Sequence, residues 1–264
     1  MYAHSRGVEL AFDIQGSGPD VLLIAGSAST RPLWALVRPA LAQSFRTIAF
    51  DNRDSGESTI VAAPYTLAGL ADDAVAVLDA AGSKSAHVIG HSMGGAIAQE
   101  LALSYPDRVQ SLTLVSTWAR GDRYSRNIMD LMIDLTRSVR DDFALLESII
   151  FVGAGISTLR GASLHDMTAA AMALGPLAPR NALERQWRLD EIVDTLDRLP
   201  ALKMPAHVIT GAEDRLLPPY FSEELARAIP GATLTRIDGV GHLPMVHAPD
   251  AFIDAVTSHI KTVA

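Results

Sequence analysis

The sequence predicts an α/β protein in which a mostly parallel sheet carries helices on both faces and a helical segment interrupts the alternation. Two observations predict this fold class. Short apolar runs that suit buried strands alternate with longer runs whose apolar residues recur at helical spacing. This alternation stops between residues 118 and 200, where helical patterns follow one another without a convincing strand. Strands that alternate with helices form parallel sheets covered on both faces.

The individual elements follow from these patterns in chain order. Strands are expected at 8–14, 21–24, 47–50, 86–89, 109–115, 206–210 and 233–237. Helices are expected at 33–43, 67–81, 96–105, 220–228 and 250–260, with others at 128–140, 142–151 and 163–174 in the inserted segment. We therefore expect an α/β core made of residues 1–117 and 201–264, with a helical insertion at 118–200.

Composition agrees with a single-core protein in the cytoplasm and argues against some classes of partner. The 264 residues are 48% hydrophobic, enough to fill one core. The net charge of −8 and the lack of a basic stripe argue against a nucleic-acid partner. The N-terminus lacks the apolar core of a signal peptide, and no apolar run is long enough to span a membrane. The chain has no cysteine, which is compatible with a reducing cytosol.

The most informative motif is the G-x-S-x-G turn at residues 90–95 (GHSMGG), between a predicted strand and a predicted helix. A sharp strand-to-helix turn strains the backbone of Ser92 and demands small neighbours, and Gly90, Gly94 and Gly95 supply them. The turn also places the serine at a helix N-terminus, which favours developing negative charge. The alternative is a glycine-rich turn with an incidental serine.

A nucleophilic serine also needs a general base and a group that orients this base. Asp214 follows the predicted strand at 206–210, and His242 lies on a loop after the strand at 233–237. The order Ser92, Asp214, His242 differs from that of the two main serine protease folds.

On these motifs the chain resembles the α/β-hydrolase superfamily from about Gly7 to its C-terminus. The resemblance implies that Ser92 is the nucleophile, His242 the general base and acid, and Asp214 the orienting carboxylate. Glu213 is the neighbouring rival for the last role, although the family's G-x-x-D pattern selects Asp214. The family's other acid position falls at residues 114–117, where no carboxylate stands.

The resemblance also implies an oxyanion hole built from two backbone N–H groups. Met93, after the nucleophile, is expected to supply one, and Ser27, after the strand at 21–24, the other. Many relatives have His-Gly in this loop, whereas Ala25 here replaces the histidine. Residues 22–41 resemble 3-oxoadipate enol-lactonases, which also lack the histidine and have a tryptophan where Trp34 stands.

The turn at residues 51–58 (DNRDSGES) resembles the family's D-x-R-G-x-G-x-S loop, with Asp54 in place of a glycine. Aclacinomycin methylesterases and their relatives carry a similar variant. Two interpretations are open: Arg53 or Asp54 touches the substrate, or the segment is a hydrogen-bonded turn after a strand.

In this family an insertion such as 118–200 forms a cap over the serine, which excludes water and shapes the pocket. Trp118, at the start of the insertion, and Trp34, near the oxyanion loop, are the expected substrate contacts. Trp187 is as compatible with a core position. Methionines of the insertion suit a pliable pocket or ordinary packing.

No cofactor and no metal are expected. Gly153 and Gly155 form an isolated glycine pair without the strand and acidic partner of a dinucleotide site. The histidines lack H-E-x-x-H spacing, and His242 with His247 fits no familiar zinc pattern.

The sequence therefore predicts a serine hydrolase that cleaves a carboxylic ester or lactone of a mainly apolar small molecule through an acyl-enzyme. Two alternatives remain, because a fold and even a triad do not fix function. One is a ligand receptor on this fold with little turnover. The other is a carbon–carbon bond hydrolase, cofactor-free haloperoxidase or thioesterase with the same triad; the usual asparagine of carbon–carbon hydrolases is replaced here by His91.

Overall fold

The computed structural model describes residues 1–263, and within them eight strands form one sheet in the order β1-β2-β4-β3-β5-β6-β7-β8. Pairs β1–β2 and β2–β4 are antiparallel, and the other neighbouring pairs are parallel. The strands are β1 (Tyr2–Ser5), β2 (Val8–Gln15), β3 (Asp20–Ile24), β4 (Arg46–Phe50), β5 (Ala86–His91), β6 (Val109–Val115), β7 (Ala206–Gly211) and β8 (Thr233–Ile237). The predicted mostly parallel sheet is confirmed.

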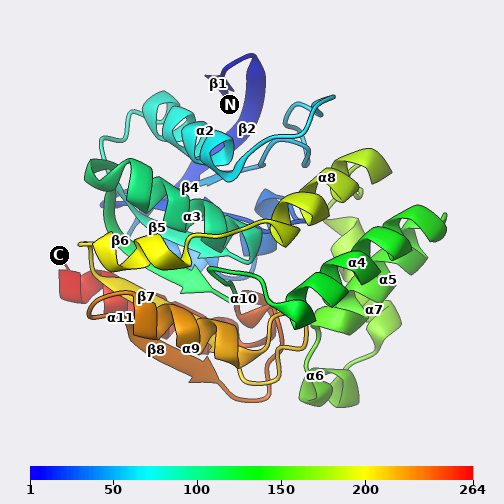
Figure 1. The fold of residues 1–264 in the computed structure, drawn as a ribbon. Coiled ribbons are helices and arrows are strands. Elements are labelled where there is room, and N and C mark those ends of the chain that lie inside the picture. The colour runs from blue at the N-terminus through cyan, green and yellow to red at the C-terminus, as the bar shows by residue number, and fades with distance from the viewer. Residues whose placement is uncertain (264) are drawn as a thin grey trace.

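Helices cover both faces of this sheet (Figure 1). One face packs against α2 (Leu67–Ala80), α3 (Met93–Ser104) and α9 (Pro219–Ala228). The other packs against α1 (Arg38–Leu41), α10 (Pro244–His247) and α11 (Pro249–Val263). The described residues also form three short 3₁₀ helices: η1 (Arg31–Trp34), η2 (Pro106–Arg108) and η3 (Leu196–Ala201). Within residues 1–263, no helix combines the length and the apolar character that a membrane span requires.

Two of the differences from the sequence-based prediction concern the helix expected at 33–43 and the strand β1; α6 (Ile156–Gly161), α8 (Arg180–Glu191) and α10 were also not predicted, and α4 (Arg123–Ser138) begins before residue 128. The helix expected at 33–43 is split into η1 and α1, each with a proline in its first turn. Pro39 has no N–H for a helix that begins upstream, and its ring would clash with the carbonyl one turn earlier. Strand β1 was not predicted, because its residues Tyr-Ala-His-Ser form no apolar run. It becomes a strand by pairing with β2.

The insertion between β6 and β7 is built mainly of helices. Its helices are α4 (Arg123–Ser138), α5 (Asp142–Gly153), α6 (Ile156–Gly161), α7 (Leu164–Ala173) and α8 (Arg180–Glu191), and they gather at one side of the sheet (Figure 1). The chain enters and leaves at adjacent points, because Arg120 and Asp194 form an antiparallel bridge. The Thr195 amide also donates to the Ala119 carbonyl at 2.8 Å.

A buried histidine lies between the sheet and α11. His207 on β7 is hydrogen-bonded through Nε2 to Thr235 Oγ1 at 2.8 Å, and its ring centroid is 5.3 Å from that of His259. Burial, and secondarily the nearby His259, lower the pKa of His207 to about 4. Neutral His207 is therefore the form that the folded protein accommodates.

This burial predicts a loss of stability in mild acid. Between an ordinary histidine pKa of about 6.5 and the folded value of about 4, the unfolded chain binds a proton that the folded chain does not. The free energy of unfolding should thus decrease as pH falls through this window, by about 2.5 kcal/mol from this group at pH 4.5. His207→Gln should flatten this part of the profile in urea titrations at several pH values. Parallel profiles for the two proteins would contradict the assignment.

Candidate active site

The turn between β5 and α3 has the strained geometry that the motif predicts. Ser92 has φ 54° and ψ −122°, a left-handed conformation that non-glycine residues rarely adopt. Its amide donates to the Val115 carbonyl at 2.9 Å, and its carbonyl accepts from Thr117 Oγ1 at 2.7 Å. These contacts with the end of β6 hold the strained residue in place.

The glycines of the motif allow the helix and strands to approach closely. A Cβ atom on Gly94 would lie 2.2 Å from the Ile24 carbonyl oxygen, and one on Gly90 would lie 2.2 Å from the Gly94 carbonyl oxygen. Both contacts are with backbone atoms that cannot rotate away. Larger residues at these positions would therefore push α3 off the sheet and move Ser92.

Asp214 and His242 are brought together by the loops that follow β7 and β8. His242 Nδ1 lies 2.8 Å from Asp214 Oδ2, and both side chains are buried. The other carboxylate oxygen of Asp214 accepts the amides of Leu216 and Leu217 at 2.9 Å each. A carboxylate can only accept, so Nδ1 carries the proton and Nε2 of neutral His242 offers a lone pair.

The loop that carries His242 is fixed from two sides. The His242 amide donates to the Gly153 carbonyl of the insertion at 2.8 Å. On the other side, His91 Nε2 lies 3.0 Å from the His242 carbonyl oxygen, and the two rings meet edge-on with centroids 4.7 Å apart. Burial, and secondarily His242, lower the pKa of His91 well below its ordinary value. His91 is thus a neutral donor that supports the His242 backbone.

Glu213, the alternative to Asp214 as the orienting carboxylate, contacts the insertion. Its carboxylate accepts the Ser157 amide at 2.6 Å and the Ser157 hydroxyl at 2.5 Å, at the start of α6. These hydrogen bonds lower the pKa of Glu213. Glu213 therefore joins the insertion to the core, whereas Asp214 faces His242.

The predicted oxyanion loop lies against Ser92. A Cβ atom on Gly26 would lie 2.8 Å from the Ser92 Cβ atom, so the loop touches the serine directly. The next residue is Ser27, and the amide after it, that of Ala28, already donates to Gln186 Oε1 of α8 at 2.8 Å. Met93 opens α3 immediately after Ser92. This placement is compatible with Ser27 and Met93 as the two donors.

The two tryptophans expected to contact substrate occupy different surroundings. Trp34 is fully buried among core residues next to α11, with its ring centroid 6.3 Å from that of Phe252. We therefore assign Trp34 to the core. Trp118 is buried in the cluster between core and insertion, together with Ala96, Leu217 and Phe221. Trp118 remains a proposed substrate contact.

Arg53 and Asp54 are both held in internal ion pairs. The Arg53 guanidinium makes two hydrogen bonds of 2.6 Å to Asp73 on α2. Asp54, fully buried at φ 67°, accepts two hydrogen bonds from Arg185 of α8 at 2.8 and 2.9 Å. These contacts favour the interpretation of residues 51–58 as a structural turn.

Two polar residues of α8 that reach the site were missed by the sequence analysis. Gln186 and Asp190 are buried and contact the oxyanion loop, at Ala28 and Ser27 respectively. The available signal was their spacing: they share a helix face with Leu183 and Trp187, where apolar residues are expected.

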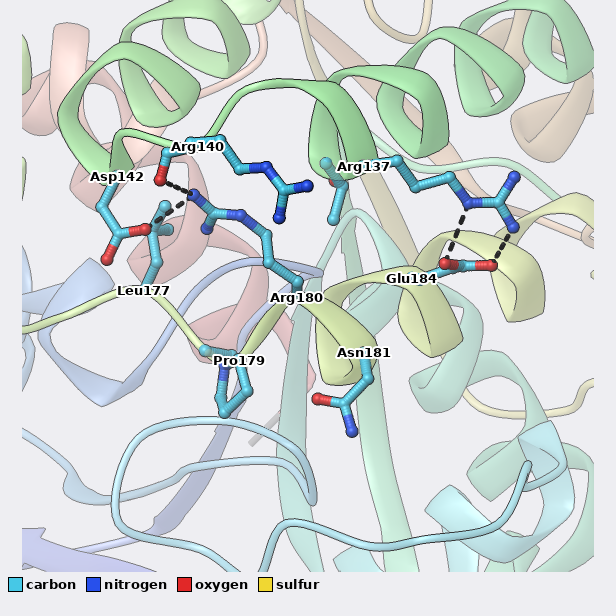
Figure 2. Close-up of a pocket in the computed structure, with 10 residues that line it drawn as sticks. Arg137, Arg140, Asp142, Leu177, Pro179, Arg180, Asn181 and Glu184 are labelled. Carbon is cyan, nitrogen blue, oxygen red and sulfur yellow. Dashed lines mark hydrogen bonds and ion pairs between the residues drawn. The ribbon is translucent and has the colours of Figure 1, made fainter.

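A groove on the insertion lies between α4 and α8 (Figure 2). Arginines line it together with acidic partners: Arg137 pairs with Glu184, and Arg180 pairs with Asp142 at 2.7 Å. None of Ser92, Asp214 and His242 belongs to its lining. This groove is therefore separate from the candidate active site.

Known proteins are similar to this chain in sequence and in fold. The model of a family described as the alpha/beta hydrolase fold matches residues 19–249. A protein of Azorhizobium caulinodans, provisionally named the carbamate hydrolase RutD, is 31% identical over 257 residues, which cover 95% of this chain and 94% of the relative.

Two solved structures have the same architecture. A thermophilic esterase from Thermogutta terrifontis, with malate bound, has a TM-score of 0.87 and 29% identity, and the match covers 100% of this chain and 98% of the esterase. The enol-lactonase from Burkholderia xenovorans LB400 has a TM-score of 0.88 and 25% identity, over 99% of this chain and 100% of the lactonase.

The contrast between Asp214 and Glu213 gives a matched test. Asp214→Asn should lower kcat by about 10⁴, because an amide cannot hold His242 in the tautomer that accepts a proton. Glu213→Gln, the neighbouring change of the same kind, should alter kcat less than about threefold, because it loosens only the contact with Ser157. Steady-state kinetics of the two variants give the kcat values that test this assignment. A larger loss for Glu213→Gln would transfer the orienting role to Glu213.

Proposed function

The chain belongs to the α/β-hydrolase superfamily, and on this premise we propose that it is a serine hydrolase of carboxylic esters or lactones. The single observation that carries the proposal is the buried Asp214–His242 hydrogen bond of 2.8 Å, in a structure whose strained Ser92 lies at the start of α3 and follows His91, which contacts His242. A purely structural function would not need a serine, a histidine and an aspartate in this combination, whereas nucleophilic catalysis needs all three.

In the proposed reaction Ser92 attacks the carbonyl carbon of the ester or lactone. His242 Nε2 accepts the hydroxyl proton, because Nδ1 is occupied by its hydrogen bond to Asp214. The resulting imidazolium lies beside the Asp214 carboxylate. The oxyanion of the tetrahedral intermediate accepts hydrogen bonds from the Ser27 and Met93 amides.

Collapse of the intermediate transfers the proton from His242 to the leaving alkoxide and leaves an acyl group on Ser92. Water then attacks the acyl-enzyme while His242 accepts one of its protons. A second tetrahedral intermediate collapses, the carboxylic acid leaves, and Ser92 regains its proton.

We propose that residues 118–200 act as a cap on the core formed by residues 1–117 and 201–264. Ser92 and His242 are only 7% and 6% exposed, so little solvent reaches them. The cluster that lies between core and insertion is apolar and includes Trp118, Met129 and Phe221. Such surroundings favour an uncharged, mainly apolar acyl or alcohol portion.

The relatives support a carbonyl substrate and suggest the range of a substrate screen. Their names include an esterase, an enol-lactonase and a provisional carbamate hydrolase. All three substrate types present a carbonyl carbon to a nucleophile. Esters, lactones, carbamates and thioesters of varied chain length should therefore be assayed together.

Removal of the nucleophile is the first test. Ser92→Ala should fold normally and lower kcat on the best ester or lactone by about 10⁶. A serine-reactive phosphonate should label Ser92 alone, as peptide mass spectrometry would show. Activity above one tenth of the wild type, or labelling at another residue, would exclude Ser92 as nucleophile. Failure of every ester and lactone to turn over would favour a ligand receptor.

The apolar cluster gives a test of selectivity. Trp118→Phe should change the ratio of kcat/KM values between short and long acyl esters by about tenfold, because it reshapes the pocket without opening a large cavity. Phe221→Leu, a comparable change in the same cluster, serves as the control for packing. A preference of the wild type for dicarboxylates would contradict an apolar pocket.

A further inference from the structure

Helix α8 presents a polar face to two loops of the core. Polar side chains are rarely buried unless each has a partner, and those of α8 bridge two chain segments far apart in sequence. Gln186 accepts the Ala28 amide at 2.8 Å and donates to Ser55 Oγ at 3.0 Å. Asp190 accepts the Ser27 hydroxyl at 2.7 Å.

The loop that these residues hold is strained. Ala28 has φ 55°, which is costly for a residue with a Cβ atom. Such a conformation persists only where its surroundings impose it. The surroundings of Ala28 include Gln186, which is fully buried and fixed at both ends of its amide. The loop conformation therefore depends on a helix of the insertion.

Asp190 is an unusual partner for a serine. It is 3% exposed, and its Oδ1 atom has no hydrogen-bond partner among the described residues. Burial raises the pKa of Asp190 to about 8, and the hydrogen bond from Ser27 opposes this shift only in part. At neutral pH the side chain is therefore mainly an uncharged acid. A neutral group can lie beside a developing oxyanion without repelling it.

The contacts of Ser27 place this acid next to the reacting centre. The Ser27 hydroxyl lies 3.2 Å from the sulfur of Met93, the residue expected to supply the other oxyanion donor. Gly26, which precedes Ser27, packs against the Cβ atom of Ser92. The hydroxyl of Ser27 is thus held by Asp190 in a loop whose backbone touches Ser92.

We propose that Asp190 and Gln186 are positioning residues of the oxyanion hole, which hold Ser27 and Ala28 so that the Ser27 amide points at the substrate carbonyl oxygen. The inference rests on the proposed function, because it assigns a second task to the insertion in the same reaction. The insertion would complete the oxyanion hole as well as cover it. Geometric errors of about 1 Å at such sites lower rates by about a hundredfold.

The central test compares three variants at the end of α8. Asp190→Leu keeps the branched shape but removes the acceptor, so kcat should fall about tenfold to a hundredfold with KM changed less than threefold. Asp190→Asn keeps an oxygen for the Ser27 hydroxyl and should retain kcat within about threefold. Glu191→Gln, an adjacent change that weakens only the pair with Arg188, should leave kcat unchanged.

Two further readouts separate positioning from general support of the fold. A trifluoromethyl ketone forms a tetrahedral oxyanion with a serine, and Asp190→Leu should weaken its inhibition by the same factor as kcat. The melting temperature of this variant should stay at or above the wild-type value, because leucine replaces a buried acid with an unpartnered oxygen. A lowered melting temperature that accounts for the lost rate would overturn the proposal.

A double-mutant cycle with Ser27→Ala tests the route of the effect. If Asp190 acts through the Ser27 hydroxyl, the combination of Ser27→Ala with Asp190→Leu should be no slower than the slower single variant. If the fall in kcat of the double variant equals the product of the two single falls, the proposal is overturned. Equal falls in kcat for Asp190→Leu and Asp190→Asn would also overturn it. Ser92→Ala distinguishes the two hypotheses: an active Ser92→Ala refutes the proposed function, whereas an inactive one with a fully active Asp190→Leu refutes only the role of Asp190.

Discussion

The close approach of α3 to the sheet is the constraint on which the rest of the site depends. Gly90 and Gly94 leave no room for a Cβ atom, because backbone oxygens lie where it would be. Only this approach lets the chain reverse from β5 into α3 through a single strained residue, Ser92. The serine is thereby lifted to the edge of the sheet and placed at the positive end of the helix dipole. Gly26 then brings the oxyanion loop against it.

The parallel strands deliver the other two groups to the same edge. Asp214 follows β7 and His242 follows β8, and strands that run in one direction end on one side of the sheet. The insertion contacts this edge at several points. A Cβ atom on Gly241 would lie 2.3 Å from the Gly153 carbonyl oxygen, so the end of α5 packs tightly on the histidine loop. Glu213 and Asp190 add polar contacts on either side. The insertion and the site are thus one packed unit.

Much of the fold and the centre of the candidate site could be predicted from local sequence. Six of the seven expected strands begin and end within one residue of their counterparts in the structure; the strand expected at 86–89 extends to His91. The predicted α/β-hydrolase fold and superfamily are confirmed by the family match. Apolar periodicity and turn glycines lie within a few residues of the elements they specify, so these elements can be identified from a single sequence. The turn around Ser92 and the loop positions of Asp214 and His242 are encoded in this local way.

Tertiary contacts decided what local sequence could not. Strand β1 exists because β2 pairs with it, and Trp34 is a core residue because α11 packs over it. The partners Ser27 and Asp190 are separated by 163 positions, and nothing near either residue specifies the other. By itself the sequence determined every strand except β1, the strained turn at Ser92 and the chain order of Ser92, Asp214 and His242, because each depends on neighbouring residues. The tertiary structure alone decided which buried polar groups meet, because burial and distance are set by the packing of segments far apart in the chain.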